Sequence, residues 1–347
     1  MIPSRLRPFV YIILSAALFG ISAPVAKLLV SDIGPVALAG LLYLGAFLGL
    51  VLLRVSPLGR NEKETVLKRS ELPYLAGSII CGGVIAPILL MTGIASVTGI
   101  ASSLLLNLEG VATALIAWLA FKEAVGRRTW AALVVMTAAG VLLALDTGGG
   151  ETSIFGAALI VMAMALWGLD NNLTSKIAST GPQRIAMLKG LVAGTASLSM
   201  SFLLGQAPAL GPEILAALLL GSLSYGVSLV LFILALGSLG PARTGAFFAL
   251  GPFIGAVAAV VLLQEMPNLV IVPAGALMAL GAYLLLTERH THLHWHSRVV
   301  HEHVHEHGNE HSHAHHPEIT GPHSHEHVHE AVLHEHEHSR DGEHHQH

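Results

Sequence analysis

Glu109 lies near the middle of a long apolar stretch at residues 97–121. At the centre of a membrane helix a charged side chain costs at least about 2.5–3.5 kcal/mol on insertion scales, so such residues are functional candidates. Ser102 and Thr113 stand seven residues before and four residues after Glu109, on one helix face, and Asn107 is close by. This polar stripe predicts a substrate or proton site, because burial favours the uncharged carboxyl group and lets it exchange protons. The alternative is a structural carboxyl group, hydrogen-bonded to a neighbouring helix.

A second polar group is carried by "WGLDNN", which contains Trp167, Asp170 and Asn171. Three consecutive polar residues of a helix point in three directions, so at most some of them face one pathway. Lys27 and Arg243 are further candidates for contact with substrate. Both lie near the ends of apolar stretches, where long cationic side chains usually reach the lipid headgroups instead.

The end of the chain predicts a third kind of chemistry, since all 22 histidines lie between His290 and His347. Neutral imidazole binds zinc, nickel, cobalt and copper, so the segment is expected to bind such ions, although no cofactor is required for the rest of the chain. Matches to H-E-x-x-H follow from the alternation of His and Glu and do not indicate a protease. The low complexity predicts a disordered tail, whose metal binding is either regulatory, as a buffer or gate, or incidental. The candidate ligands are His301, His303, His305, His307, His311, His313, His315, His323, His325, His327, His329, His334, His336 and His338.

Composition places these groups in a membrane protein. The chain is 53% apolar and 12% charged, whereas a soluble domain has about 25% charged residues. The single cysteine excludes an internal disulfide and a Cys-based zinc site, and the sparse basic residues argue against a nucleic-acid partner. Ten stretches approach the length of about 20 apolar residues that a membrane helix needs. They are Phe9–Ser31, Pro35–Arg54, Leu72–Met91, Val97–Phe121, Thr129–Leu145, Ser153–Ser175, Arg184–Leu204, Glu213–Gly237, Arg243–Gln264 and Leu269–Thr287.

The connections between these stretches indicate an orientation. Lys and Arg concentrate in alternate connections, beginning with the N-terminal segment, and the other connections hold almost none. By the positive-inside rule both termini are cytoplasmic, and the protein is expected in a plasma membrane, the inner membrane of a bacterial-type cell. The first stretch is longer than the apolar core of a signal peptide, so it is expected to remain as a span.

The apolar part of the chain repeats itself. "NLEGVATALIAWLAFKE" resembles "ALGPFIGAVAAVVLLQE" at an offset of 142 residues, and "LFGISAPVAK" resembles "LWGLDNNLTSK". Because each repeat has an odd number of five helices, the second enters the membrane inverted, which is typical of transporters. The fold class is therefore an all-α membrane protein with two inverted five-helix repeats, residues 9–145 and 153–287, followed by the histidine tail at 288–347.

These motifs, together with a Glu closing the fourth helix of each repeat, resemble the EamA-type transporters of the drug/metabolite transporter superfamily. The resemblance covers roughly residues 9–287 and implies a small-molecule carrier with a central cavity between the repeats. One departure concerns the proline common in the middle of the fourth helix of each repeat. Pro252 supplies it in the second repeat, whereas the first has Glu109-Gly110.

The expected function is therefore secondary transport rather than catalysis. The first hypothesis is an exporter that moves a small organic metabolite or amino-acid-like solute through the bilayer by alternating access. A divalent transition-metal transporter is the alternative, which the lack of histidine in the spans disfavours. A membrane-anchored metal-storage or sensing protein is the alternative of another class. The sequence does not indicate the substrate, the coupling ion or the oligomeric state.

Overall fold

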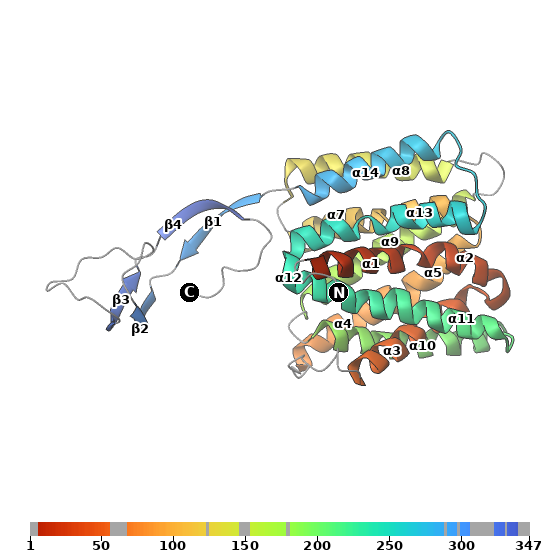
Figure 1. Cartoon of the computed structure of the whole chain (residues 1–347), viewed down its shortest axis with the longest axis horizontal. Helices are drawn as coiled ribbons and strands as arrows, with labels where there is room; N and C mark the ends of the chain where they lie inside the picture. The colour runs from red at the N-terminus through yellow and green to blue at the C-terminus, as the bar shows by residue number, and fades with distance from the viewer. Residues whose placement is uncertain are drawn as a thin grey trace. The chain divides into compact units, whose positions relative to one another are not determined.

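The computed structural model of the chain forms two units, a helical unit that reaches Glu288 and a tail unit over Arg289–Ser339 (Figure 1). We describe each unit by itself. The structure describes residues 6–55, 68–122, 125–145, 153–177 and 181–287 of the helical unit. In the tail it describes the backbone of residues 290–296, 299–305, 323–329 and 332–338.

The first repeat contains the five predicted spans, several of them broken. The first span is α1 (Arg7–Gly20) with α2 (Ser22–Ile33), and the second is α3 (Pro35–Val55). The third consists of η2 (Arg69–Glu71), α4 (Leu72–Ser78), the π-helical segment η3 (Ile79–Ile85) and α5 (Ala86–Ile94). The fourth is α6 (Gly99–Leu105) with α7 (Leu108–Phe121), and the fifth is α8 (Arg127–Leu145).

The second repeat follows the same order. It contains α9 (Ile154–Ser175), α10 (Pro182–Leu203), α11 (Pro212–Gly221), the π-helical segment η5 (Ser222–Val227), α12 (Ser228–Phe248), α13 (Gly251–Leu262) and α14 (Ile271–Leu286). Among the described residues, eight helical stretches are long and apolar enough to cross a membrane, and α13 and α14 are shorter apolar helices. Since large apolar side chains such as Leu52 and Leu203 are exposed, the helical unit has the surface of a membrane protein.

One predicted boundary is wrong. We expected a connection between Gly237 and Arg243, but α12 continues in helical conformation to Phe248, and the break falls at Ala249–Leu250. Pro241 lies in the interior of α12, where a proline can bend a helix without ending it.

The irregular segments recur in both repeats. When 142, the offset between the two repeats, is subtracted from the residue numbers of η5, they fall within the range of η3. The breaks after Leu105 and Phe248 agree with this offset to within one residue. The two halves therefore share local backbone defects as well as sequence. Such π-helical segments are frequent at functional sites.

Helices of opposite repeats pack against each other. The closest pairs are α3 with α10, α8 with α14, α1 with α12, and α9 with both α5 and α7. Small residues allow this approach. A Cβ atom on Gly194 of α10 would lie 2.7 Å from the backbone nitrogen of Leu44, and one on Gly45 would lie 2.2 Å from the carbonyl oxygen of Leu218.

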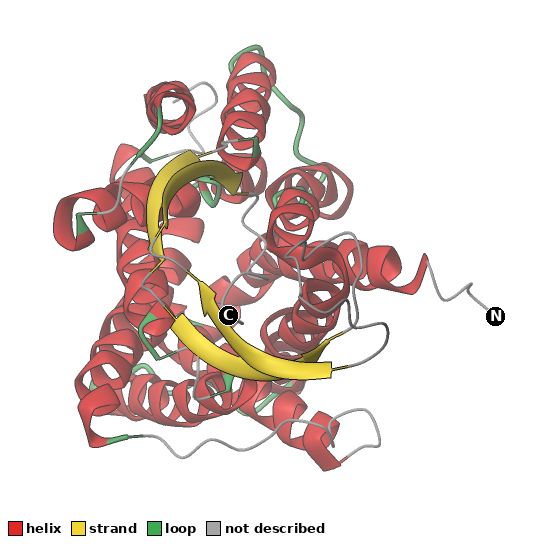
Figure 2. Cartoon of the chain, turned by 90° about the vertical axis from the view of Figure 1, so that its left-hand side faces the viewer, coloured by secondary structure: helices red, strands yellow, loops and turns green. Residues whose placement is uncertain are grey.

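In the tail the structure differs from the prediction of disorder. It describes four strands, β1 (His290–His296), β2 (Val299–His305), β3 (His323–His329) and β4 (Val332–His338), shown in yellow in Figure 2. β1 pairs with β4 and β2 pairs with β3, both antiparallel. The physical reason is the strict alternation of histidine with other residues, a period of two that fits an extended strand.

Candidate functional site

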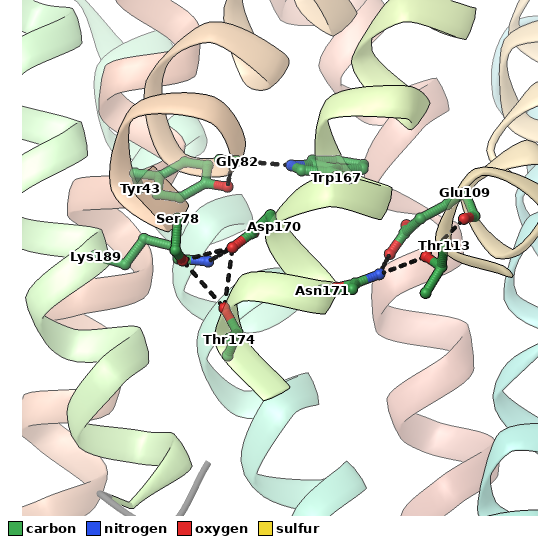
Figure 3. A network of polar contacts seen from close by, with 10 residues as sticks. All are labelled: Tyr43, Ser78, Gly82, Glu109, Thr113, Trp167, Asp170, Asn171, Thr174 and Lys189. Carbon is green, nitrogen blue, oxygen red and sulfur yellow. Dashed lines mark hydrogen bonds and ion pairs between the residues drawn. The ribbon is translucent and has the colours of Figure 1, made fainter. Parts of the chain in front are cut away.

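An ion pair inside the helical unit joins Asp170 of α9 to Lys189 of α10. The Lys189 Nζ atom lies 2.6 Å from both carboxylate oxygens of Asp170 (Figure 3). The hydroxyls of Ser78 and Thr174 donate to the Oδ1 atom of the same carboxylate. The lysine and aspartate side chains are only 14% and 9% exposed. Every oxygen of the Asp170 carboxylate is thus used by groups from the third span, α9 and α10.

This pair neutralises two charges that would be costly if buried singly. Removing one partner of a buried pair leaves an uncompensated charge, at a cost of about 3–5 kcal/mol. Sequence reasoning named Asp170 but missed Lys189 and Ser78. The signal for Lys189 was present, because the sequence places this lysine inside the predicted seventh span, where an ionisable residue is a functional candidate.

A second polar group lies on the opposite side of α9 and contains Glu109. The Asn171 side-chain amide donates to the Glu109 Oε1 atom at 2.8 Å and to the Thr113 hydroxyl oxygen at 3.1 Å. The Thr113 hydroxyl in turn donates to the backbone carbonyl of Glu109 at 2.8 Å. No ammonium or guanidinium group of a described residue is ion-paired with Glu109. The carboxyl group therefore accepts from one neutral donor and keeps acceptor capacity for a proton or a cationic group.

Glu109 marks a change in burial along the fourth span. All residues from Gly99 to Leu108 are buried, Glu109 is half-buried, and most residues of α7 beyond it are half-buried or exposed. Asn171, its hydrogen-bond partner, is exposed. The Glu109 group thus lies where the fully buried half of the span meets its less buried half.

Two aromatic side chains converge on the π-helical segment η3. The indole Nε1 of Trp167 donates to the carbonyl oxygen of Gly82 at 2.9 Å, and the hydroxyl of Tyr43 donates to the same oxygen at 2.7 Å (Figure 3). The Tyr43 ring lies 6.0 Å, between centroids, from the ring of Tyr225 in η5. The irregular segments of both repeats are therefore linked through one aromatic cluster. Sequence reasoning named Trp167 but neither tyrosine.

The three consecutive polar residues of α9 point in three directions, as expected. Asp170 faces Lys189 and Asn171 faces Glu109. The Asn172 amide donates to the carbonyl oxygens of Thr113 and Gly168, at 3.0 and 2.8 Å. Asn172 therefore attaches α9 to α7.

Four other residues predicted for the substrate pathway are not brought to these clusters. Ser102 is buried and donates to the Gly99 carbonyl of its own span, and Asn107 donates to the Leu104 carbonyl. Arg243 is exposed. Lys27 donates to the carbonyl oxygens of Ile94 and Val97, at 3.2 and 2.6 Å. Its ammonium group thus holds the end of α5.

The described part of the chain contains no cluster of three or more His, Cys, Asp or Glu residues arranged for a metal ion. His307, His311, His313 and His315 lie outside the described residues. In the strands, the backbone register places histidine opposite histidine. The pairs are His290 with His338, His292 with His336, His294 with His334, His301 with His327, His303 with His325, and His305 with His323.

The apolar helices, the two related halves and the ionisable residues between the helices define a polytopic membrane protein of the transporter class. The chain belongs to the EamA-like transporter family, whose model matches residues 6–145 and 154–287. The predicted family and the two repeats are thereby confirmed at the level of two EamA domains.

Comparison with individual proteins agrees with this assignment. The chain is 30% identical over 298 residues to an uncharacterized transporter of Methanothermobacter thermautotrophicus, covering 81% of this chain and 86% of the relative. A solved crystal structure matches 78% of this chain and 95% of its own, with a TM-score of 0.56 and 18% sequence identity. At this identity the second match supports the fold alone.

Proposed function

We propose that this protein is a secondary transporter that exports a small organic metabolite or an amino-acid-like solute by alternating access, with Glu109 at its coupling site. The observation that carries the proposal is the Glu109 carboxyl group itself. It is half-buried, accepts a hydrogen bond from neutral Asn171 and is placed where the fully buried half of the fourth span ends. A carboxyl group without a cationic partner in an apolar span can bind a proton or a positively charged part of a substrate.

The exchange of these two ligands would couple transport to a proton gradient. When Glu109 is protonated, its charge is removed and the cost of moving the site through the apolar interior falls. When it is ionised, the amide of Asn171 remains as a donor to the carboxylate. One proton returning for each cationic solute leaving would keep the site neutral in both steps.

The Asp170–Lys189 pair is assigned a positioning role in this mechanism. The bonds of Asp170 join α9 to α10 and to the third span, whereas the neighbouring Asn171 reaches Glu109 on α7. Because these two residues are adjacent on one rigid helix, the ion pair fixes the rotation of α9 that presents Asn171 to Glu109. Trp167 further attaches α9 to Gly82.

We further propose that both termini are cytoplasmic in a plasma membrane and that the tail binds zinc, nickel, cobalt or copper. The opposition of histidines in both strand pairs supports metal binding, because residues directly opposite on antiparallel strands have Cβ atoms about 4.5–5.5 Å apart. Two neighbouring pairs would offer four imidazoles, the ligand number of a tetrahedral zinc site. The tail would then act as a cytoplasmic metal buffer or gate.

Cells that express the intact chain, Glu109→Gln, or the chain ended after Thr287 test the proposal. Excreted amines and amino acids are measured together with cellular nickel, cobalt and zinc. We expect Glu109→Gln to abolish excretion and its dependence on the proton gradient, and the shortened chain to retain excretion but lose metal retention. If the intact chain changes only metal levels and both variants abolish that change, metal is the cargo and the organic substrate is wrong.

A further inference from the structure

The turn that joins α5 to α6 lies at the ends of two spans, and both repeats contact it, although its residues Ala95 and Ser96 are exposed. Ile94 and Val97 are fully buried, and burial continues through α6. One side of the turn is held within the first repeat, where the Lys27 ammonium group donates to the carbonyl oxygens of Ile94 and Val97. In the predicted topology this turn is at the outer face of the membrane.

The other side of the turn is held by the second repeat. The Glu265 Oε1 atom accepts from the backbone N–H of Gly99 at 2.6 Å, and its Oε2 atom accepts from the N–H of Ile100 at 2.9 Å. These amides begin α6 and have no carbonyl partner in the helix itself. One carboxylate thus supplies both acceptors, and bonds of this type are stronger than those between neutral groups.

Close packing surrounds this bond. A Cβ atom on Gly99 would lie 2.3 Å from the Leu263 side chain, 3.0 Å from the Ala259 side chain and 3.2 Å from the Glu265 Oε1 atom. Glycine therefore lets the end of α13 pack against the start of α6 without displacing the Leu263 side chain. The contact joins the fourth spans of the two repeats at one face of the membrane.

The opposite half of the same span is less buried. α6 is buried throughout, whereas α7 beyond Glu109 is mostly half-buried or exposed, and Asn171 beside it is exposed. A transporter that works by alternating access must close one face while the other is open. The structure combines a turn at 94–100 that is held by both repeats with a less buried half of the span beyond Glu109.

We propose that Glu265 is the latch of the outer gate. This proposal rests on the transport function proposed above. The Glu265 carboxylate holds the first turn of α6 against the second repeat while the inner half of the fourth span is accessible. Release of the Gly99 and Ile100 amides is required before Glu109 can be reached from the outer face.

Thiol labelling of the full-length protein in oriented membranes tests the latch. In a Cys81→Ser background, Ser102→Cys reports on the buried outer half. Ile116→Cys reports on the inner half, seven residues beyond Glu109 on the same helix face. A membrane-impermeant maleimide is applied from each side, with and without Glu265→Gln. We expect Glu265→Gln to raise outer labelling of the Ser102→Cys reporter about tenfold, because one charge-assisted hydrogen bond changes an equilibrium by about that factor. Inner labelling of the Ile116→Cys reporter should fall in parallel.

The matched control is Glu213→Gln, the same substitution in the first turn of α11, which the predicted topology also places on the outer side. It is expected to leave both labelling rates unchanged. Equal rises at both reporters would mean that Glu265 only stabilises the fold and would overturn the latch, as would unchanged rates. If Glu109→Gln abolishes excretion but Glu265→Gln leaves both labelling rates unchanged, the latch proposal is wrong and the transport function stands. If a reciprocal labelling shift occurs without any transported solute, the latch stands and the proposed function fails.

Discussion

Breaking the Asp170–Lys189 pair is expected to destabilise the helical unit more than any exposed charge does. With the Nζ atom 2.6 Å from both carboxylate oxygens and both side chains largely buried, each single substitution leaves an uncompensated charge. Lys189→Met and Asp170→Asn should therefore each lower the free energy of unfolding by about 3–5 kcal/mol. The double variant removes both charges and keeps an oxygen acceptor for the Ser78 and Thr174 hydroxyls. Its loss should be below about 2 kcal/mol, because a neutral replacement of a buried pair costs little.

The measurement is the free energy of unfolding of the purified full-length chain in mixed micelles, by titration with a denaturing detergent at pH 7. Lys176→Met serves as a control, since that ammonium is exposed and lies 4.7 Å from the centre of the Phe121 ring. It should cost at most about 1 kcal/mol, the size of an exposed cation–π contact. If the losses of the two single variants add up in the double variant to within about 0.5 kcal/mol, the two residues are energetically independent and the reasoning is refuted.

Two further predictions concern the aromatic cluster and the tail. Trp167→Phe and Tyr43→Phe each remove one donor to the Gly82 carbonyl, and each should lower the free energy of unfolding by about 1 kcal/mol in the same titration. The double variant should lose more than the sum of the two single losses, because the buried carbonyl then has no side-chain donor. Strictly additive losses would contradict this prediction. Zinc binding to the full-length protein should weaken at least about tenfold between pH 7.5 and 5.5, because histidine has an ordinary pKa of about 6.5 and its protonated ring cannot bind metal. Calorimetric titration measures this, and zinc affinity that does not change with pH would exclude imidazole ligands.

Local patterns in the chain were sufficient for most of the architecture. Membrane spans are recognised from runs of about 20 apolar residues, and each run is read without knowledge of its neighbours. The repeats were found by comparing segments at an offset of 142, which agrees with the family match over residues 6–145 and 154–287. Glu109 was found by the same local logic, as a charge inside an apolar run.

The π-helical segments and the helical path through Gly237–Arg243 were not predicted. A π-helical segment changes the register of a helix by a fraction of a turn, and the sequence of η3 contains only apolar residues, cysteine and glycine. Such a segment is stabilised by contacts such as those from Trp167 and Tyr43 to Gly82, which come from other helices. The strands of the tail were not predicted either, since composition suggested disorder while the period of two fits the strands that the structure describes.

The sequence by itself determined that this chain is an all-helical, two-repeat membrane protein of the transporter type with a histidine-rich end. Hydrophobicity and repetition are patterns of residue types along the chain, so both can be recognised without coordinates. Only the tertiary structure decided that Asp170 pairs with Lys189, that Glu109 is held by Asn171, and that Glu265 reaches Gly99 of the other repeat. These contacts depend on the rotation of each helix about its axis and on how closely the glycines let the helices approach, and both are set by the packing of distant segments.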